Sequence, residues 1–246
     1  MSTIQPRVAF ISDLHLGGFC TLGPNHEDYR NGIIKILRYL KEQKPTHLVM
    51  LGDMFDSWTF PRKMLPLAYE HQIKHPDNIG IIAALQEFAA DPDVTLAYTP
   101  GNHDFDLEPD LFRTYFRGTQ VADNFTLGFV WGEHGHRFDL FNATDPENRD
   151  PAKGHRPMGY YITRIHTQDI RGGGVRELPV FENSSAYIAS KLREALAELS
   201  PGKNERGMSG WTVATLVLSY VMKDAGIGYE DTILMPNGSE ITVQQV

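Results

Sequence analysis

The chain has 246 residues, 41% of them hydrophobic and 22% charged, so it is long enough for one large globular domain or a domain with an insertion. Its formal net charge of −8 argues against non-specific nucleic-acid binding, which needs basic patches. An anionic substrate is not excluded, because bound divalent cations can reverse the local potential.

The first hundred residues alternate between strand-like and helical patterns. Apolar, β-branched runs predict strands over 7–13, 47–52 and 94–98, and apolar residues at helical spacing predict helices over 27–44 and 78–90. This series predicts a largely parallel sheet with right-handed crossovers, in which ligands bind beyond the carboxyl ends of the strands. The proline-rich stretch between the second strand and the second helix, 57–77, is expected to be an irregular excursion that shapes a substrate wall.

The second half of the chain changes character. A further strand is predicted over 125–131, a loop over 142–159, helices over 184–199 and 210–225, and a hairpin around Asn237-Gly238. We therefore expect three parts, a catalytic core over 1–141, a loop-rich and helical insertion or cap over 142–228, and a C-terminal β-hairpin over 229–246.

Cysteine content and apolar runs bear on the compartment. The single cysteine, Cys20, cannot form an internal disulfide, which fits a reducing compartment. The N-terminus lacks the apolar region of a signal peptide, and the most apolar later run, 211–222, is too short to span a bilayer. We therefore expect a cytoplasmic protein without a transmembrane segment. The 211–222 run is either core or a cap helix that contacts an acyl chain.

Four short motifs follow predicted strands, and they can meet at one edge of the sheet. They are Asp13-Leu14-His15, Gly52-Asp53-Met54-Phe55-Asp56, Gly101-Asn102-His103-Asp104 and His134-Gly135-His136. Together they offer carboxylate, amide and imidazole groups, which are ligands for a pair of metal ions.

Each proposed ligand has a chemical reason. Asp13 and His15 are two apart, so in an extended segment they point the same way and can grip one cation. Asp53 has two carboxylate oxygens with which to bridge two ions. Asn102 offers an amide oxygen to the second ion, and His134 offers a ring nitrogen. Alone, each has an ordinary structural explanation such as a turn or a cap, but their combination and order favour a metal site.

Four further residues are left with two interpretations each. Asp56 and Asp104 either orient the imidazole ligands or cap the segments that follow them. His136 either faces the same way as His134 or is structural. Arg164 either clamps phosphate with two hydrogen bonds or is a solvated arginine.

With these motifs the chain resembles the calcineurin-like metallophosphoesterase superfamily, whose pattern runs D-x-H, G-D, G-N-H-[DE], a lone His and then G-H-x-H. The resemblance implies an α/β fold, an α/β/β/α sandwich of two mixed sheets with a dinuclear metal site. It implies a phosphoesterase that hydrolyses a phosphate ester or a pyrophosphate by attack of a metal-bridging hydroxide. By position, the resemblance assigns Asp13 and His15 to the first ion, Asp53 to a bridge between the ions, and Asn102 and His134 to the second ion. It implies that His103 either stabilises the leaving group or donates a proton to it.

The ligand chemistry narrows the choice of metal. Mixed oxygen and nitrogen ligands without thiolates suit manganese, iron or zinc better than magnesium or calcium. We expect two divalent ions and rank manganese first among these candidate metals. Asp13 and Asp53 offset only part of their charge, so a positive excess faces the phosphorylated substrate, a small molecule or a lipid.

One motif of the family pattern is absent from this sequence. No G-H-x-H follows His134, so we expect a fragment that lacks the last strands, binds metal weakly and shows little activity. The other possibility is a protein with depleted ion sites, for which His136, His155 and His166 are the first substitutes to examine.

The resemblance also suggests a branch. The run from Gly52 to Trp58, with Asp13-Leu14-His15-Leu16 before it, looks most like UDP-2,3-diacylglucosamine pyrophosphatases. Two alternatives therefore stand beside a general phosphoesterase. One is a UDP-sugar-lipid pyrophosphohydrolase with an acyl groove formed by 57–73 and the late helices. The other is a non-catalytic scaffold of the same fold. The sequence does not indicate an oligomeric state.

Overall fold

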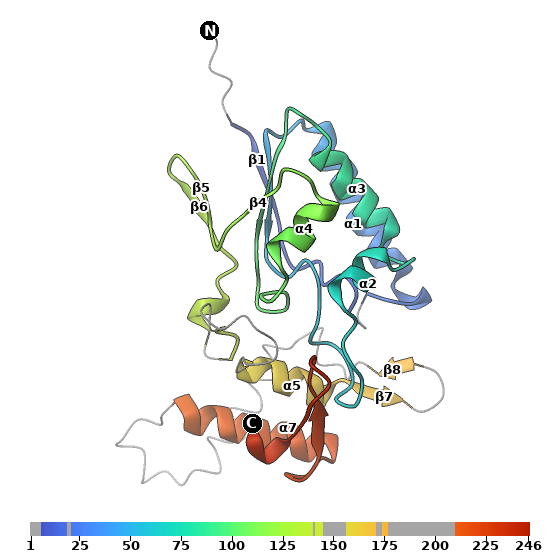
Figure 1. Cartoon of the computed structure of the whole chain (residues 1–246), viewed down its shortest axis with the longest axis vertical. Helices are drawn as coiled ribbons and strands as arrows, with labels where there is room; N and C mark the ends of the chain where they lie inside the picture. Colours follow the sequence, from blue (N-terminus) through green and yellow to red (C-terminus); the bar gives the residue numbers. More distant parts are fainter. Residues whose placement is uncertain (1–5, 19–20, 140, 145–155, 171–173, 177–209) are drawn as a thin grey trace. The chain divides into compact units, whose positions relative to one another are not determined.

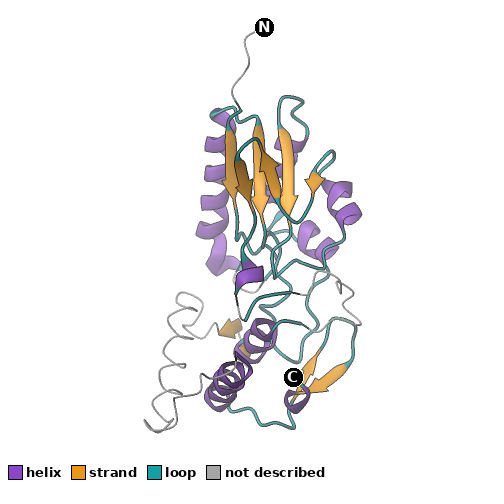
Figure 2. Ribbon diagram, turned by 90° about the vertical axis from the view of Figure 1, so that its left-hand side faces the viewer, coloured by secondary structure: helices purple, strands orange, loops and turns teal. Residues whose placement is uncertain are grey.

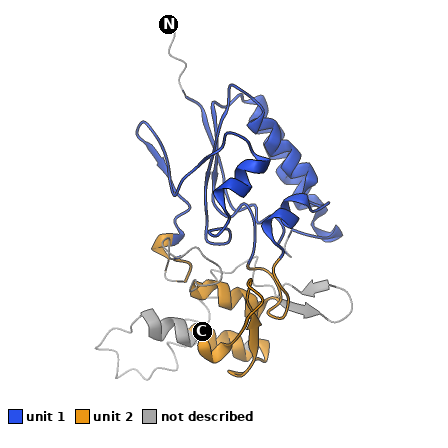
Figure 3. Cartoon of the chain, in the orientation of Figure 1, with its two compact units in different colours: residues 1–57, 67–136, 144–153 blue, residues 58–66, 137–143, 154–246 orange. Residues whose placement is uncertain are grey.

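The computed structural model describes residues 6–18, 21–139, 141–144, 156–170, 174–176 and 210–246 (Figure 1). The chain divides into two compact units (Figure 3). Unit 1 comprises residues 1–57, 67–136 and 144–153, and unit 2 comprises residues 58–66, 137–143 and 154–246. The chain therefore passes between the units several times.

Unit 1 is built on a four-stranded sheet whose strands all run parallel (Figure 2). The strands, in spatial and chain order, are β1 (Val8–Ile11), β2 (His47–Leu51), β3 (Thr95–Thr99) and β4 (Gln120–Val121). The register pairs Phe10 with Val49, and Val49 with Ala97. The predicted parallel sheet is confirmed. The first three of the four motifs follow the carboxyl ends of β1, β2 and β3.

The helices of unit 1 share a core with one face of this sheet. They are η1 (Pro24–His26), α1 (Glu27–Glu42), α2 (Tyr69–Lys74), α3 (Ile79–Ala89) and α4 (Pro109–Tyr115). Ile33 and Leu37, one turn apart on α1, are buried with Leu85 of α3. Leu48 and Met50 of β2 point into the same core. The helix α2 lies inside the stretch that we expected to be irregular.

The opposite face of the sheet meets a hairpin where the sequence predicted one strand. The segment 125–131 forms β5 (Phe125–Leu127) and β6 (Val130–Gly132), which pair antiparallel. Gly128 between them has φ of 60°, a left-handed conformation that reverses the chain. Phe125 is buried against Val49 and Ala97. Among the described residues of unit 1 this hairpin stands where a second mixed sheet was expected.

Unit 2 is a smaller helical unit with its own core. Its elements are α5 (Met158–His166), β7 (Gln168–Ile170), β8 (Gly174–Arg176), α7 (Gly210–Ala225), β9 (Thr232–Leu234), β10 (Glu240–Thr242) and η4 (Val243–Gln245), and η2 (His136–Phe138) spans the junction. The predicted helix over 210–225 and the hairpin β9–β10 are confirmed. The helix predicted over 184–199 lies outside the described residues.

The units differ from the three parts expected from sequence. The segment 58–66 belongs to unit 2, although it lies within the expected core of 1–141. Trp58 packs edge-on against Tyr160 of α5 at 5.8 Å between ring centroids. Ile233 of the terminal hairpin is buried in the same cluster as Val221 of α7. The hairpin is therefore part of unit 2. No described helix has the length and apolar character needed to cross a membrane.

Candidate metal centre

The loops after β1 and β2 are hydrogen-bonded to each other, which brings the first two motifs together. The backbone N–H of Asp13 donates to Gly52 O at 3.1 Å, and that of His15 donates to Asp53 O at 2.9 Å. Leu16 continues the pairing beyond them, as a parallel bridge to Phe55. The motifs therefore meet at the carboxyl edge of the sheet, as expected for ligand sites in parallel sheets.

Three proposed ligands have an unusual backbone conformation. Asp13, His15 and Asp53 have φ values of 57°, 46° and 52°. Left-handed φ is uncommon for residues other than glycine and marks positions that the surrounding structure constrains. The expectation that Asp13 and His15 point the same way because they lie in an extended strand was wrong, since β1 ends at Ile11. Two left-handed residues direct these side chains instead.

The glycines of the second and third motifs are required by close approach. A Cβ at Gly52, whose φ is 78°, would lie 2.4 Å from Cγ of His134. A Cβ at Gly101 would lie 2.0 Å from Oδ1 of Asp53. Any larger residue would displace a proposed ligand, which explains physically why the motifs read Gly-Asp and Gly-Asn-His.

The five proposed ligands converge on the carboxylate of Asp53. Its Oδ2 lies 3.2 Å from Nε2 of His134 and 3.8 Å from Nε2 of His15. Asn102 places Oδ1 3.1 Å from Nε2 of His134, and Asp13 places Oδ1 3.9 Å from Nε2 of His15. Donor atoms of His15, Asp56 and His103 lie within 4.8 Å of one another, and so do those of Asp13, His134 and Asp53. Its other oxygen, Oδ1, accepts the backbone N–H of His103 at 2.8 Å.

These donors fit divalent cations. Nδ1 of His134 lies 2.8 Å from Leu51 O and donates to this carbonyl, which turns Nε2 toward Asp53. His15 is oriented in the same way, with Nδ1 against Asp56. A second hydrogen bond of this kind is the usual support of a metal-ligating imidazole. Lone pairs of nitrogen and oxygen that face one another at these distances repel unless a cation or a proton lies between them. The set would suit manganese, iron or zinc.

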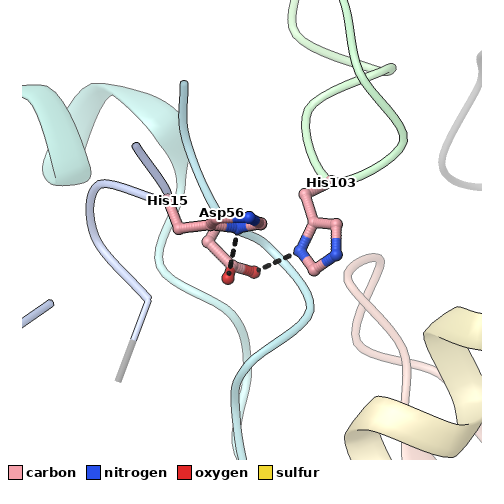
Figure 4. Close-up of side chains that lie close together, drawn as sticks. All are labelled: His15, Asp56 and His103. Atoms are coloured by element: carbon pink, nitrogen blue, oxygen red, sulfur yellow. Dashed lines mark hydrogen bonds and ion pairs between the residues drawn. The ribbon is translucent and has the colours of Figure 1, made fainter. Parts of the chain in front are cut away.

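Asp56 holds two imidazoles at once (Figure 4). Its Oδ2 lies 3.1 Å from Nδ1 of His15, and its Oδ1 lies 3.0 Å from Nδ1 of His103. The side chain is fully buried. Burial opposes its ionisation, yet the charge and hydrogen bond of His103 and the contact with His15 hold the pKa of Asp56 well below its usual range. Of the two interpretations from sequence, the contacts match the one in which Asp56 orients imidazoles.

The charges of the site act strongly on its histidines. Burial alone would lower the pKa of His15, but the hydrogen bond and charge of Asp56, with the charges of Asp53 and Asp13, raise it to about 9. The pKa of His134 is also raised to about 9, against burial, by its hydrogen bond to Asp53 and the charge of that carboxylate. The same imidazoles and His103 lower the pKa of Asp53 below its usual range, although burial raises it. The site attracts positive charge.

Asp104 ties the loops together through their backbones. Its carboxylate accepts N–H groups from Gly101 at 2.8 Å, Met54 at 2.7 Å and Phe55 at 3.1 Å. Burial and the charge of Asp53 raise its pKa to about 6, although the backbone N–H donors lower it. Asp104 therefore neither orients an imidazole ligand nor caps the segment after it. It holds the second motif against the third.

The contacts of His136 agree with its structural interpretation, whereas those of Arg164 agree with neither of its two interpretations. Nε2 of His136 lies 3.1 Å from Oγ1 of Thr144, and within the described part of the chain His136 does not join the donors around Asp53. Arg164 is fully buried in unit 2, where it donates to Phe60 O at 2.9 Å and to Met64 O at 2.6 Å. Both interpretations of Arg164, a phosphate clamp and a solvated side chain, were wrong, because backbone carbonyls take up its guanidinium. Of the other histidines named as substitutes, His166 is buried in unit 2 and His155 lies outside the described residues.

The motifs did not reveal Gln72 and Tyr69 on α2. Gln72 pairs with both main-chain groups of Asp56, and the hydroxyl of Tyr69 contacts His103 O at 3.3 Å. Their three-residue spacing places both side chains on one side of a helix. The prolines around this stretch led us to expect irregular structure, so the helical spacing was not recognised.

The chain was compared with known proteins. A family model described as calcineurin-like phosphoesterase matches residues 6–181. A search of curated proteins finds no match. Among solved structures, the Pseudomonas putida nuclease MPE aligns with a TM-score of 0.34 and 16% identity. That alignment covers 50% of this chain and spans only about half of the nuclease, 51%. The family match covers more than half of the chain and includes all four motifs, so the chain belongs to the calcineurin-like phosphoesterase family.

Proposed function

We propose that this chain hydrolyses a phosphate ester or a pyrophosphate with two divalent metal ions, manganese first among the candidates. One observation carries the proposal. The side chains of Asp13, His15, Asn102 and His134 gather around the buried carboxylate of Asp53, and donor atoms of Asp13, His134 and Asp53 lie within 4.8 Å of one another. Groups in this arrangement repel one another unless a cation or bound protons neutralise them, and a divalent cation does so without protonating the imidazoles.

Each residue has a role in this proposal. Asp13 and His15 would hold one ion, Asn102 and His134 would hold the other, and Asp53 would be the ligand common to both. The ions, when bound, supply the Lewis acidity that activates water and neutralises phosphate charge. Asp13 and Asp53 are the only charged ligands proposed, so the bound site keeps a positive excess toward an anionic substrate. Asp56 and Leu51 O fix the two imidazoles so that Nε2 faces the ions.

His103 is the proposed acid for the leaving group. Its Nδ1 pairs with Asp56 at 3.0 Å, and its backbone N–H donates to Asp53 Oδ1. With Nδ1 engaged, Nε2 is the ring atom that delivers a proton to the departing oxygen. A carboxylate that holds the imidazole in this way fixes both the orientation of the ring and the nitrogen that carries the proton.

A UDP-sugar-lipid pyrophosphohydrolase is the second candidate. It rests on the resemblance of Gly52–Trp58 and on two exposed apolar side chains, Met64 and Leu65, in the segment proposed for an acyl groove. Trp58 and Phe60 of the same segment are buried, so they do not line such a groove. In this segment, contacts with the acyl chain of a lipid substrate would therefore come from Met64 and Leu65.

Metal-dependent turnover tests the proposal. The protein is stripped with a chelator, reloaded with Mn²⁺, Fe²⁺ or Zn²⁺, and given a phosphomonoester, a phosphodiester and a UDP-sugar pyrophosphate. Turnover that requires metal and is lost in Asp53→Asn supports the phosphoesterase. Two bound ions without turnover of any substrate would favour the scaffold. Failure to bind any ion would contradict the metal site itself.

A further inference from the structure

Helix α2 contains none of the four motifs, but it contacts two of the loops that carry them. Tyr69 and Gln72 are three residues apart, which places them on the same side of this short helix. Gln72 faces the loop that carries Asp56, and Tyr69 faces the loop that carries His103.

Gln72 makes a paired contact with the backbone of Asp56. Its Nε2 donates to Asp56 O at 2.9 Å, and its Oε1 accepts the N–H of Asp56 at 3.2 Å. Nε2 also donates to Leu67 O at 2.7 Å. The side chain is fully buried, and a Cβ at Gly17 would lie 2.5 Å from its Cγ. Gln72 is therefore wedged between the loops of the first and second motifs.

Gln72 can influence His15 and His103 only indirectly, through the carboxylate of Asp56. The two hydrogen bonds between Gln72 and the main chain of Asp56 flank the Cα of Asp56. Together with the hydrogen bond that the same N–H donates to Leu16 O at 3.1 Å, they fix the direction in which the carboxylate leaves the backbone. This carboxylate sets Nδ1 of His15 and Nδ1 of His103. A shift of about 1 Å at a catalytic group can cost about 10²-fold in rate, so a modest rotation of Asp56 would reach both imidazoles.

The loop that carries His103, the second imidazole bound by Asp56, also contacts helix α2. Ser57 Oγ donates to His103 O at 2.8 Å, and the Tyr69 hydroxyl lies 3.4 Å from Ser57 Oγ. Tyr69 also donates to Asp106, three residues after His103. The helix itself is anchored by Asn78, whose Nδ2 donates to Gln72 O at 2.8 Å.

We propose that Gln72 is a positioning residue, whose side-chain amide aligns Asp56 so that one carboxylate orients both the metal-ligating His15 and the acid His103. The proposal rests on the function proposed above. An uncharged amide is suited to this position because it both donates to and accepts from the main chain. Neither a carboxylate nor a thioether can do both.

The test compares Gln72→Met, which has nearly the same length but no donor, with Ile73→Ala. Ile73 is the next residue on α2 and is buried in the core of unit 1. Its apolar side chain cannot hydrogen-bond to Asp56, so its variant controls for a general loss of stability. At saturating Mn²⁺, Gln72→Met should lower kcat for phenyl phosphate by about 10–100-fold and much less for para-nitrophenyl phosphate, whose leaving group needs no proton. Its Mn²⁺ dissociation constant should rise by about 10-fold. Ile73→Ala should change neither.

A third measurement needs neither metal nor turnover. Nδ1 protons that donate to a buried carboxylate give downfield proton NMR signals protected from exchange with water. The signals of His15 and His103 should be present in the metal-free wild type and in Ile73→Ala, and lost in Gln72→Met. Should Gln72→Met not fold, Gln72→Glu, which keeps the acceptor for the Asp56 N–H, replaces it with the same expectations.

The outcomes separate the two proposals. If both downfield signals and the dependence on leaving group survive in the Gln72 variant, Gln72 is merely structural and the inference is wrong. If the wild type hydrolyses no ester but its Gln72 variant loses both signals, the proposed function fails and the positioning of the imidazoles by Gln72 stands.

Discussion

Gly101 and Asp53 are in direct contact across the carboxyl ends of β2 and β3, so closely that a Cβ at position 101 would lie 2.0 Å from Oδ1 of Asp53. The next nearest atom, the backbone nitrogen of Asp53, would lie at 2.5 Å. Real Cβ contacts are never this short, so backbone or carboxylate must move if Gly101 acquires a side chain. The glycine of the third motif therefore sets the position of the carboxylate that we propose as the ligand shared by two metal ions.

Replacing Gly101 with alanine should damage the metal site more than its single methyl group suggests. We expect Gly101→Ala to lower the melting temperature and to weaken Mn²⁺ binding, because overpacking typically costs about 1–3 kcal/mol and here displaces Asp53. Calorimetry of the metal-free and metal-loaded protein measures both effects. Gly32→Ala, in α1 with open space around the new Cβ, is the control and should stabilise by about 0.5–1 kcal/mol. Similar effects of both substitutions would contradict the close approach.

Asp53→Asn tests the shared ligand. A neutral amide is a poorer bridge between two cations than a carboxylate, so metal stoichiometry should fall and metal-dependent hydrolysis should be abolished. Elemental analysis of the purified protein and turnover of a phosphodiester check the two effects. Asp110→Asn is the control. The side chain of Asp110 is 98% exposed, so this substitution should change neither metal content nor turnover. Full metal content together with full activity in Asp53→Asn would sink the dinuclear assignment.

His103→Ala should separate binding from chemistry. The imidazole of His103 is held by Asp56 through Nδ1 and is not among the proposed ligands, so metal content should be unchanged. Turnover should fall by about 10²–10⁴-fold, the usual contribution of a positioned acid, and the loss should shrink as the leaving group becomes a weaker base. His71→Ala, an exposed histidine on α2, serves as the control. Equal losses for all leaving groups would assign His103 to binding.

Most of the sheet could be predicted from sequence because its strands are apolar runs that end in the motifs. Both ends of β2 and of β3 lie within one residue of the expected ranges. The hairpin β5–β6 was missed because Phe125–Trp131 is apolar on both sides of Gly128, so the run reads as one strand. Only the positive φ of Gly128 shows that the chain turns there.

The candidate site was predicted by residue type more accurately than by geometry. Spacing suggested an extended Asp13–His15 pair, whereas left-handed backbone sets their directions. Arg164 was misread because its partners are carbonyls about a hundred residues away, and backbone acceptors leave no trace in a sequence. Gln72 was missed for the same reason, since it binds the main chain of Asp56 rather than a side chain.

The raised pKa values of His15 and His134 predict how stability changes with pH in the absence of metal. Both values rise from an ordinary 6.5 to about 9, so the folded state holds more protons than the unfolded state between these limits. The resulting stabilisation is fully present below pH 6.5 and is lost as pH rises through 9. At about 1.4 kcal/mol per pKa unit, the metal-free protein should lose a few kcal/mol, and its melting temperature should fall over this range.

Bound metal should reverse this trend, because a cation takes the place of the two protons. Metal binding requires neutral imidazoles, so the rise in melting temperature on adding Mn²⁺ should grow between pH 6.5 and 9. Thermal unfolding with chelator and with excess Mn²⁺, at several pH values, measures both slopes. In His134→Gln one titrating group is removed, and the slope of the metal-free protein should become shallower. A metal-free melting temperature that stays constant across this range would show that the carboxylates around Asp53 do not hold the imidazoles in their charged form.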